Sequence, residues 1–264
     1  MGRISFFISL YVVQLFGQQL QVNYDLTYSS ENEKRTLSYI LDIAEQKSVF
    51  RTQTRKTSDS LVVSTGLGLQ YYYNPDHELY LIKDLKSDEF LKKIVFAVSR
   101  DQFLIEIDER LDWNILSETS TIAGLNCQKA TVNYGGRNWT AYFTPDVAVS
   151  EGPYYFHGLP GLIIQIQDAE NHFNFTATSI KEIMHPSLYE TGPGHQISWT
   201  QYKKQLKSYY DDPYRAVRLQ GMKVVTDNGS GGYKPINFRE RIKENQAMLR
   251  RSNPIELNRK LLLD

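Results

Sequence analysis

Apolar and polar positions alternate along the first two thirds of the chain. Val22, Tyr24 and Leu26 fall on one side of an extended segment, and the polar residues between them fall on the other. This period of two is typical of half-buried β-strands. We expect strands over residues 22–28, 37–43, 49–54, 69–73, 78–83, 93–98, 102–108, 128–134, 137–143, 162–167 and 172–180, with a polar turn over 55–60.

Short turns separate the predicted strands. The most distinct turn is Gly135-Gly136, which lies between two alternating segments. Two glycines suit a two-residue hairpin loop with a primed turn, because such turns need positive φ. Strands spaced this closely favour an antiparallel meander over βαβ units.

The hydrophobic period changes near residue 198. Ser198 and Gln201 form a capping box, and Trp199, Tyr202 and Leu206 recur at helical spacing, so a helix is expected here. Two more helices are predicted: a short one that begins at Asp212-Pro213 and ends at Gly221, and one over 237–252.

The pattern as a whole predicts a mainly β protein with C-terminal helices (α+β). We expect a large curved antiparallel sheet or half-barrel meander, because a sheet with this many strands must curl, close or be covered. Residues 1–17 are expected to be a signal peptide, and residues 18–264 a single domain. Within that domain, 18–185 is the antiparallel β part and 196–252 the helical part.

The N-terminus has the pattern of a signal peptide. Arg3 precedes the apolar segment 4–16, and the small residue Gly17 precedes Gln18. No cysteine follows the apolar segment, so a lipoprotein is not expected. That segment is too short to span a membrane, and no other segment approaches the necessary length. We expect an exported protein, either periplasmic or secreted.

A proline–glycine corner precedes one of the most apolar strands. Pro160-Gly161 has the residue order of a type II turn, with Leu159 and Leu162 at its ends. Apolar residues at both ends of a turn predict that it folds back against the core. A lid that contacts a ligand is the alternative.

The same stretch carries a resemblance. Residues 158–163 read Gly-Leu-Pro-Gly-Leu-Ile, and 124–130, 136–139, 152–154 and 253–256 fit the same pattern. The chain resembles the GLPGLI family of secreted Bacteroidota proteins, closely over 120–170 and loosely elsewhere. Tyr142-Phe143 departs from the Trp-Tyr expected of that family. No activity is established for the family, so the resemblance implies a compartment and a fold without a reaction.

The net charge and the cysteine content limit which binding partners and which covalent cross-links are expected. Basic and acidic residues number 30 each, so no global field attracts nucleic acid or an anionic membrane. Cys127 is the only cysteine, which excludes an intramolecular disulfide. A lone cysteine between strand residues is expected to be a small buried side chain, with a reactive thiol as the alternative.

Candidate catalytic groups are sparse. The five histidines show no metal-binding spacing, and no nucleophile motif occurs, so no metal or cofactor is predicted. His157 and His172 could meet across neighbouring strands. Four carboxylates near the corner are candidates for a hydrolase: Asp146, Glu151, Asp168 and Glu170.

Aromatic residues near the corner are candidates for a binding site. They could form a platform for a sugar or the wall of an apolar pocket, although packing within the sheet explains them equally well. Arg137 is expected at a solvent-exposed hairpin tip, where it could place a charge beside the aromatic rings. The candidate binding residues are Arg137, Trp139, Tyr142, Tyr154, Tyr155, Phe156 and His157.

Three functions remain open. The first is a non-catalytic carrier or binding protein for an apolar ligand, a glycan or an envelope component. The second is a structural subunit of an envelope assembly that docks through a sheet edge or the basic C-terminal helix. The third is a hydrolase that uses carboxylates in 146–172. A cavity under residues 158–163 would favour the first, and the sequence leaves the oligomeric state open.

Overall fold

The computed structural model describes residues 19–263, apart from 31–32, 70–73, 97, 99–100, 185, 187 and 189–193. The expected signal peptide therefore lies outside the described residues. So do His185 and most of the strand predicted over 69–73.

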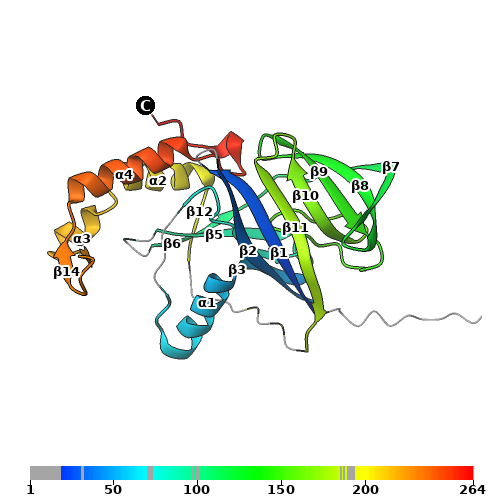
Figure 1. Ribbon diagram of the computed structural model, residues 1–264, viewed down its shortest axis with the longest axis horizontal. Coiled ribbons are helices and arrows are strands. Elements are labelled where there is room, and N and C mark those ends of the chain that lie inside the picture. Colours follow the sequence, from blue (N-terminus) through cyan, green and yellow to red (C-terminus); the bar gives the residue numbers. More distant parts are fainter. Residues whose placement is uncertain are drawn as a thin grey trace, which may run out of the picture.

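Twelve strands of the described chain form one curved sheet that does not close (Figure 1). In order across the sheet they are β12 (His195–Ile197), β6 (Gln102–Glu106), β5 (Glu89–Val95), β4 (Tyr80–Asp84), β3 (Lys47–Thr52), β2 (Glu33–Ala44), β1 (Gln19–Ser30), β11 (Phe173–Glu182), β10 (Leu162–Asp168), β9 (Arg137–Thr144), β8 (Leu125–Tyr134) and β7 (Asn114–Ile122). Neighbours are antiparallel except β12 and β6, which are parallel. The predicted fold class is confirmed, with that one parallel pair added.

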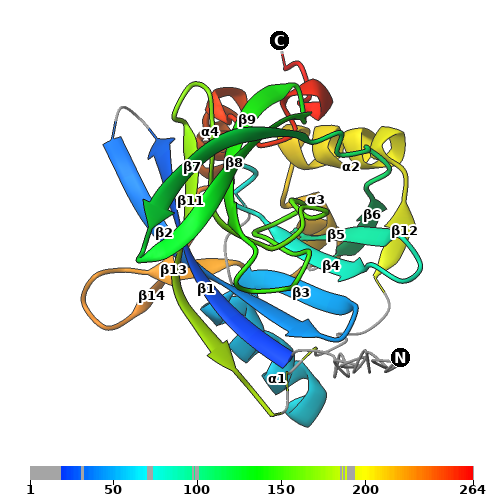
Figure 2. The ribbon, with the colours of Figure 1, turned by 90° about the vertical axis from the view of Figure 1, so that its right-hand side faces the viewer.

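The chain builds the sheet from its middle. β1 is central, β2 to β6 follow in order on one side, and the chain then crosses to β7 at the opposite edge and returns through β8 to β11. The crossing segment, 107–113, has seven residues and can span at most about 25 Å. The two halves of the sheet must therefore curl toward each other, and Figure 2 shows the strands curving around an interior.

The hairpin prediction is confirmed, whereas two strands of the sheet, β7 and β12, were missed. Gly135 and Gly136 have φ of 64° and 78°, the signs that a type I′ turn requires. β7 was not predicted from the sequence. Most of its residues are exposed at the sheet edge, so it lacks the alternation that marks a half-buried strand.

The polar turn predicted over 55–60 is wrong, because these residues lie in helix α1 (Gln53–Thr65). Thr52 caps the first turn through its side chain, and Gly66 ends the helix in a left-handed conformation. The buried residues of α1 are Ser58 and Asp59, so the helix has no apolar stripe that could reveal it.

A polar layer lies between α1 and the outer face of the sheet. Arg51 alternates with core residue Phe50 along β3 and so points to the opposite face. Its guanidinium donates to Asp59 at 2.7 Å and to Asp42 at 3.3 Å, and it also bonds the Tyr80 hydroxyl. This network explains why α1 packs on the sheet through polar residues.

The helical part follows the sheet. α2 (Trp199–Asp211) begins at the predicted Ser198 capping box, and α4 (Phe238–Arg251) begins at Asn237, as expected. α3 (Arg215–Leu219) is shorter than predicted and starts after Asp212-Pro213, at a position without a side-chain cap. Residues 228–232 join two short strands, β13 (Val225–Asp227) and β14 (Tyr233–Pro235), and η1 (Leu257–Arg259) follows α4.

Residues 145–161 connect β9 to β10, and residues 151–156 of this segment are buried in the interior of the curled sheet. Leu159 is 1% exposed, so the corner is folded inward as predicted. The predicted type II turn is wrong: Gly161 N–H donates to the Leu159 carbonyl at 2.8 Å, closing a three-residue turn around Pro160. Leu162 N–H instead bonds the Val147 carbonyl.

Candidate functional site

The predicted aromatic platform is part of the core. Tyr154, Tyr155 and Phe156 are all buried. The Tyr155 ring contacts Phe90 of β5 at 5.2 Å and Tyr134 of β8 at 4.9 Å. Because β5 and β8 lie on opposite halves of the sheet, Tyr155 bridges the interior. These rings leave no open surface on which a sugar could stack.

The other predicted aromatic and imidazole groups are also enclosed to differing degrees. Trp139 is buried, and its indole N–H donates to the Tyr134 carbonyl at 3.0 Å. Tyr142 lies on the opposite face of β9 and is half-buried. His157 stacks on Phe90 with ring centroids 4.4 Å apart, and burial, with a smaller effect of Lys83, lowers its pKa.

Arg137 is not at a solvent-exposed hairpin tip, so that expectation is wrong. Its side chain is buried, donates to Asp168 at 3.0 Å and to the Pro254 carbonyl at 3.1 Å, and also bonds the Asn253 side chain. The guanidinium therefore fastens the segment after α4 to the β8–β9 hairpin. The expectation failed because nothing near Arg137 in sequence reveals a segment more than a hundred residues away.

Three of the four candidate carboxylates, Glu151, Asp168 and Glu170, approach cationic side chains. Buried Glu151 is ion-paired with Lys83 and accepts a bond from Ser48 at 2.7 Å, while buried Asp168 is held by Arg137. Asp146 is exposed. The described chain contains no group of three or more His, Cys, Asp or Glu residues able to hold a metal ion.

Cys127 is buried, as expected for a small core side chain. Burial raises the pKa of its thiol. His172 packs against Phe173 at 4.6 Å, in surroundings different from those of His157.

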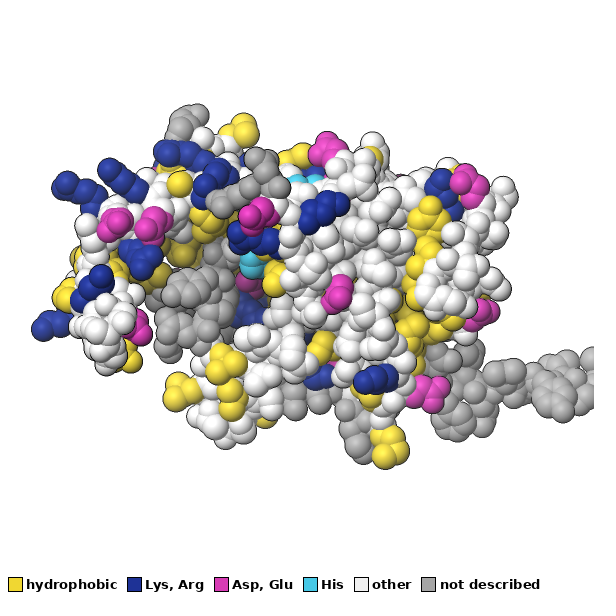
Figure 3. All heavy atoms as spheres, in the orientation of Figure 1, with side chains coloured by type: hydrophobic (Ala, Val, Ile, Leu, Met, Phe, Trp, Pro, Cys, Tyr) yellow, Lys and Arg dark blue, Asp and Glu magenta, His cyan; other side chains and the backbone are white. Residues whose placement is uncertain are grey.

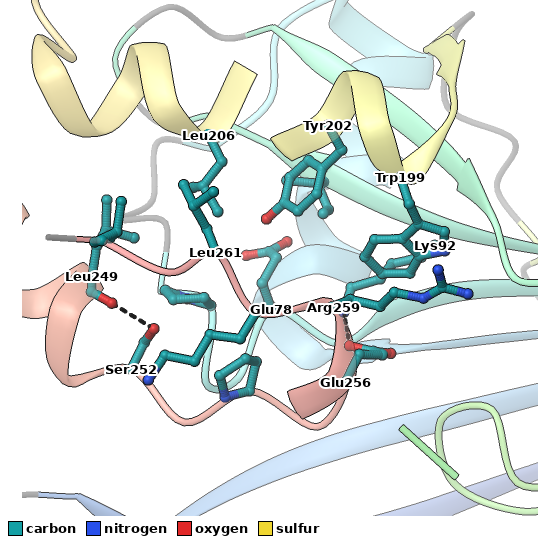
Figure 4. A pocket seen from close by; sticks show the side chains of 15 residues that line it. Glu78, Lys92, Trp199, Tyr202, Leu206, Leu249, Ser252, Glu256, Arg259 and Leu261 are labelled. Atoms are coloured by element: carbon teal, nitrogen blue, oxygen red, sulfur yellow. Dashed lines mark hydrogen bonds and ion pairs between the residues drawn. The ribbon is translucent and has the colours of Figure 1, made fainter. Parts of the chain in front are cut away.

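A pocket lies where the sheet meets the helices (Figure 4). We call it the junction pocket. β5 and the segment before β4 form its floor, α2 one wall, and α4 with the following segment the other. Its lining comprises Pro75, Glu78, Lys92, Ile94, Trp199, Tyr202, Leu206, Leu249, Ser252, Pro254, Glu256, Arg259, Lys260, Leu261 and Leu263.

A buried ion pair lies at the base of this pocket. Lys92 Nζ donates to Glu256 at 2.7 Å, and Glu256 also accepts bonds from the hydroxyls of Tyr134, at 2.9 Å, and Tyr154. Burial alone would raise the pKa of Glu256, but the Lys92 ammonium and these bonds outweigh it and hold the pKa below its ordinary value. Tyr154 has a left-handed φ of 51°, a conformation rare for a bulky residue.

Cations and aromatic rings surround Trp199. Lys92 Nζ lies 5.9 Å from the Trp199 ring, and the Arg259 guanidinium lies 5.7 Å from it. Both distances fit cation–π contacts. Arg259 also approaches Asp108 at 3.9 Å, and Asp108 lines an open groove of about 360 Å³ together with Glu106, Gln196 and others. The Trp199–Arg259 pair thus separates the junction pocket from this groove.

The junction pocket is nearly filled by the chain itself. Its free volume is about 40 Å³, room for little more than one or two water molecules. Leu261 and Leu263 lie among its lining residues. A larger ligand must therefore displace leucine side chains of the segment 260–263.

Sequence reasoning identified only part of this pocket. The capping box and helical spacing placed Trp199, Tyr202 and Leu206 on one helix face, but nothing marked that face as a pocket wall. Lys92 and Glu256 come from distant segments and carry no local motif.

A family model described as "Protein of unknown function (Porph_ging)" matches residues 135–165. The matched residues include Gly158–Ile163, on which the GLPGLI resemblance rests. The family model and the resemblance agree that no function is established for such sequences. No curated protein matches the sequence.

Solved structures resemble the fold at low sequence identity. Two crystal forms of PNGF-II, in space groups C2 and P21, each give a TM-score of 0.52, with 17% and 15% identity, over 72% of this chain and 33% of theirs. The chain therefore spans about a third of those structures. A LolA superfamily protein, NE2245 from Nitrosomonas europaea, covers 67% of this chain and 91% of its own at 9% identity and a TM-score of 0.30. These likenesses concern the fold alone. No helix in the described chain is long and apolar enough to cross a membrane.

Proposed function

We propose that the protein is a non-catalytic binding protein whose ligand enters the junction pocket. The observation that supports this most strongly is the lining itself, in which leucines from α2, α4 and the segment 260–263 lie beside aromatic and charged side chains. Pockets of this composition, mostly apolar with a few placed polar groups, are typical of small-molecule sites.

The charges favour an amphipathic anion. Lys92 is already neutralised by Glu256, but Arg259 and Lys260 are half-buried at the pocket. Among the described residues, the acidic partner of Arg259 is Asp108, at the limit of an ion pair. A carboxylate or phosphate headgroup would complement these two cations, while its apolar chain replaces Leu261 and Leu263.

A fluorescent acid tests the proposal. Dansyl-labelled undecanoic acid should bind with an emission increase, and its methyl ester should bind about tenfold more weakly, a loss of about 1.4 kcal/mol of binding free energy. Leu206→Trp should block the pocket, whereas Val63→Trp, on an exposed position of α1, should leave binding unchanged. Leu261→Ala with Leu263→Ala should tighten binding because less side chain must move.

Two results would contradict it. One is no binding by either the wild type or the double-alanine variant. The other is a Leu206→Trp variant that binds as well as the wild type.

A glycan is the second candidate, favoured by the open groove beside Trp199. Its carboxylates and amides, Glu106, Asp108 and Gln196, could hydrogen-bond a sugar while Trp199 provides a ring face. Binding of oligosaccharides that survives Leu206→Trp but is lost in Gln196→Ala would support this site instead.

We also propose export through the expected signal peptide, residues 1–17. Intact mass measurement of the protein recovered from its native host should show a chain that begins at Gln18. Recovery of a chain that retains Arg3 would contradict export by this route.

A further inference from the structure

Apolar side chains are exposed at the end of the helical part, away from the β7–β9 edge of the sheet (Figure 1). Leu219 is 80% exposed at the end of α3, and Tyr233 is 79% exposed in β14. Met222 and Val225, which lie between them in the chain, are about half exposed. We call this region, residues 215–243, the distal tip.

The β13–β14 ribbon in the distal tip is supported by no other strand of the described chain. Val225 pairs with Pro235, and Asp227 pairs with Tyr233. Directly opposed residues share a face, so Val225, Tyr233 and Pro235 lie on one side of the ribbon, together with Asp227. An isolated two-stranded ribbon is marginally stable, and an exposed, largely apolar face makes contact with a further surface favourable.

The distal tip is strongly basic although the chain as a whole is neutral. Residues 215–243 contain seven basic and two acidic residues, a net charge of +5 that the rest of the chain balances with −5. Figure 3 shows Lys and Arg side chains gathered at this end, with hydrophobic side chains among them. The overall neutrality noted from composition therefore conceals a local positive field.

Most of these cations are available. Arg218 pairs with Asp212, and Arg241 pairs with Glu244. The remaining five are exposed and make no ion pair within the described residues: Arg215, Lys223, Lys234, Arg239 and Lys243.

We propose that the distal tip docks on an anionic lipid surface. Long basic side chains reach the headgroups, while Leu219, Met222 and Tyr233 enter the interface between headgroups and acyl chains. Exposed apolar groups surrounded by cations match this surface in both its chemistry and its charge. The tip is separate from the junction pocket in sequence and composition, so this inference does not depend on the proposed ligand.

Vesicle flotation of the chain from Gln18 onward tests the proposal. At 50 mM NaCl the protein should float with vesicles of phosphatidylcholine and phosphatidylglycerol (70:30) and remain unbound with phosphatidylcholine alone. Lys223→Glu with Lys234→Glu should weaken partitioning at least about tenfold. Leu219→Ser with Tyr233→Ser should weaken it about as much. All four positions are exposed, so the melting temperature should not change.

Matched controls lie elsewhere on the surface. Lys34→Glu reverses an exposed charge on β2, and Met184→Ser removes a side chain that is 84% exposed; both should float like the wild type. The proposal is overturned if the wild type does not float, or if controls and tip variants lose binding equally. A concentration-dependent dimer that Tyr233→Ser abolishes would also overturn it, because the tip would then cover a second copy of the chain.

Discussion

At the scale of single residues, Gly161 shows how closely the corner approaches a neighbouring strand. Its φ is 150°, and a Cβ placed there would lie 2.1 Å from the Thr144 carbonyl oxygen. Glycine is therefore required by both the backbone conformation and the space. The sequence indicated the first reason through the Pro-Gly order, but the contact with Thr144 becomes visible only in the fold.

Replacing this glycine should destabilise the protein more than replacing a glycine in open space. Gly161→Ala should cost about 3 kcal/mol or more, because overpacking adds to an unfavourable φ. Gly221 also has a positive φ, 67°, but nothing lies within 4 Å of the position that a Cβ would take there. Gly221→Ala should cost about 1 kcal/mol. Urea denaturation of both variants provides the comparison, and equal losses would contradict the close approach.

At the residue scale, the sequence predicted which side chains are buried but not which residues they contact. The burial of Tyr154 to Phe156 follows from their apolar character, but their role as core rather than platform depends on Phe90 and Tyr134 across the interior. Local sequence carries no information about such contacts, since they join strands from opposite halves of the sheet.

At the scale of elements, the segment after α4 is held to the β8–β9 hairpin by charge. Arg137 bonds Asp168 as well as the Asn253 side chain and the Pro254 carbonyl. Beyond it, Asn258 N–H donates to the Gly135 carbonyl at 3.1 Å. These contacts place Glu256 over Lys92, so the junction pocket depends on them.

Arg137→Met should therefore cost about 3–5 kcal/mol, because buried Asp168 is left without its cation. Amide hydrogen exchange should rise over 252–259 if this segment loosens. The matched variant Lys129→Met breaks an exposed pair with Glu118 and should cost less than about 1 kcal/mol. Similar losses in the two variants would argue against an anchoring role for Arg137.

The two longest elements that sequence reasoning missed, α1 and β7, share a cause. Neither α1 nor β7 buries an apolar stripe: α1 buries Ser58 and Asp59, and β7 is mostly exposed. Hydrophobic periodicity detects an element only through the apolar face that it buries. α2 was found because Tyr202 and Leu206 are buried on one face next to a clear capping box.

At the scale of the whole molecule, buried charge makes stability depend on pH. Lys93 lies on the outer face of β5, and burial lowers its pKa to about 8, with smaller opposing effects from Asp59 and others. Between pH 8 and 10 the unfolded chain keeps a proton on this lysine that the folded protein has lost. The contribution of Lys93 to stability should therefore rise with pH in this interval, against the opposite contribution of buried tyrosines such as Tyr24 and Tyr134, whose pKa values are raised by burial.

The Lys93 contribution should grow by about 2 kcal/mol between pH 8 and pH 10, so the stability of the wild type relative to Lys93→Met should increase by about this amount over the interval. Denaturation at several pH values measures the slope for both proteins. Lys34→Met, at an exposed position, should retain the wild-type slope. A variant slope equal to that of the wild type would show that Lys93 is not the group responsible.

The curved sheet and the C-terminal helices could be predicted, but the strand order could not. Alternation of apolar and polar residues indicates that strands exist and which face of each is buried. The order of the strands depends instead on where the chain crosses from one edge of the sheet to the other. Here that crossing is the short segment 107–113, which carries no distinctive motif, and it decides which strands meet.

The position of β1 has a consequence for how the protein is made. This first strand bonds β2 on one side and β11 on the other, so Tyr28 pairs with Phe173. During synthesis, one margin of β1 has no partner until the eleventh strand emerges, and pairings across such long loops form slowly. Until then the backbone N–H and C=O groups on that side of β1 are unpaired. Premature association of the nascent chain with other chains would therefore begin at this edge of β1.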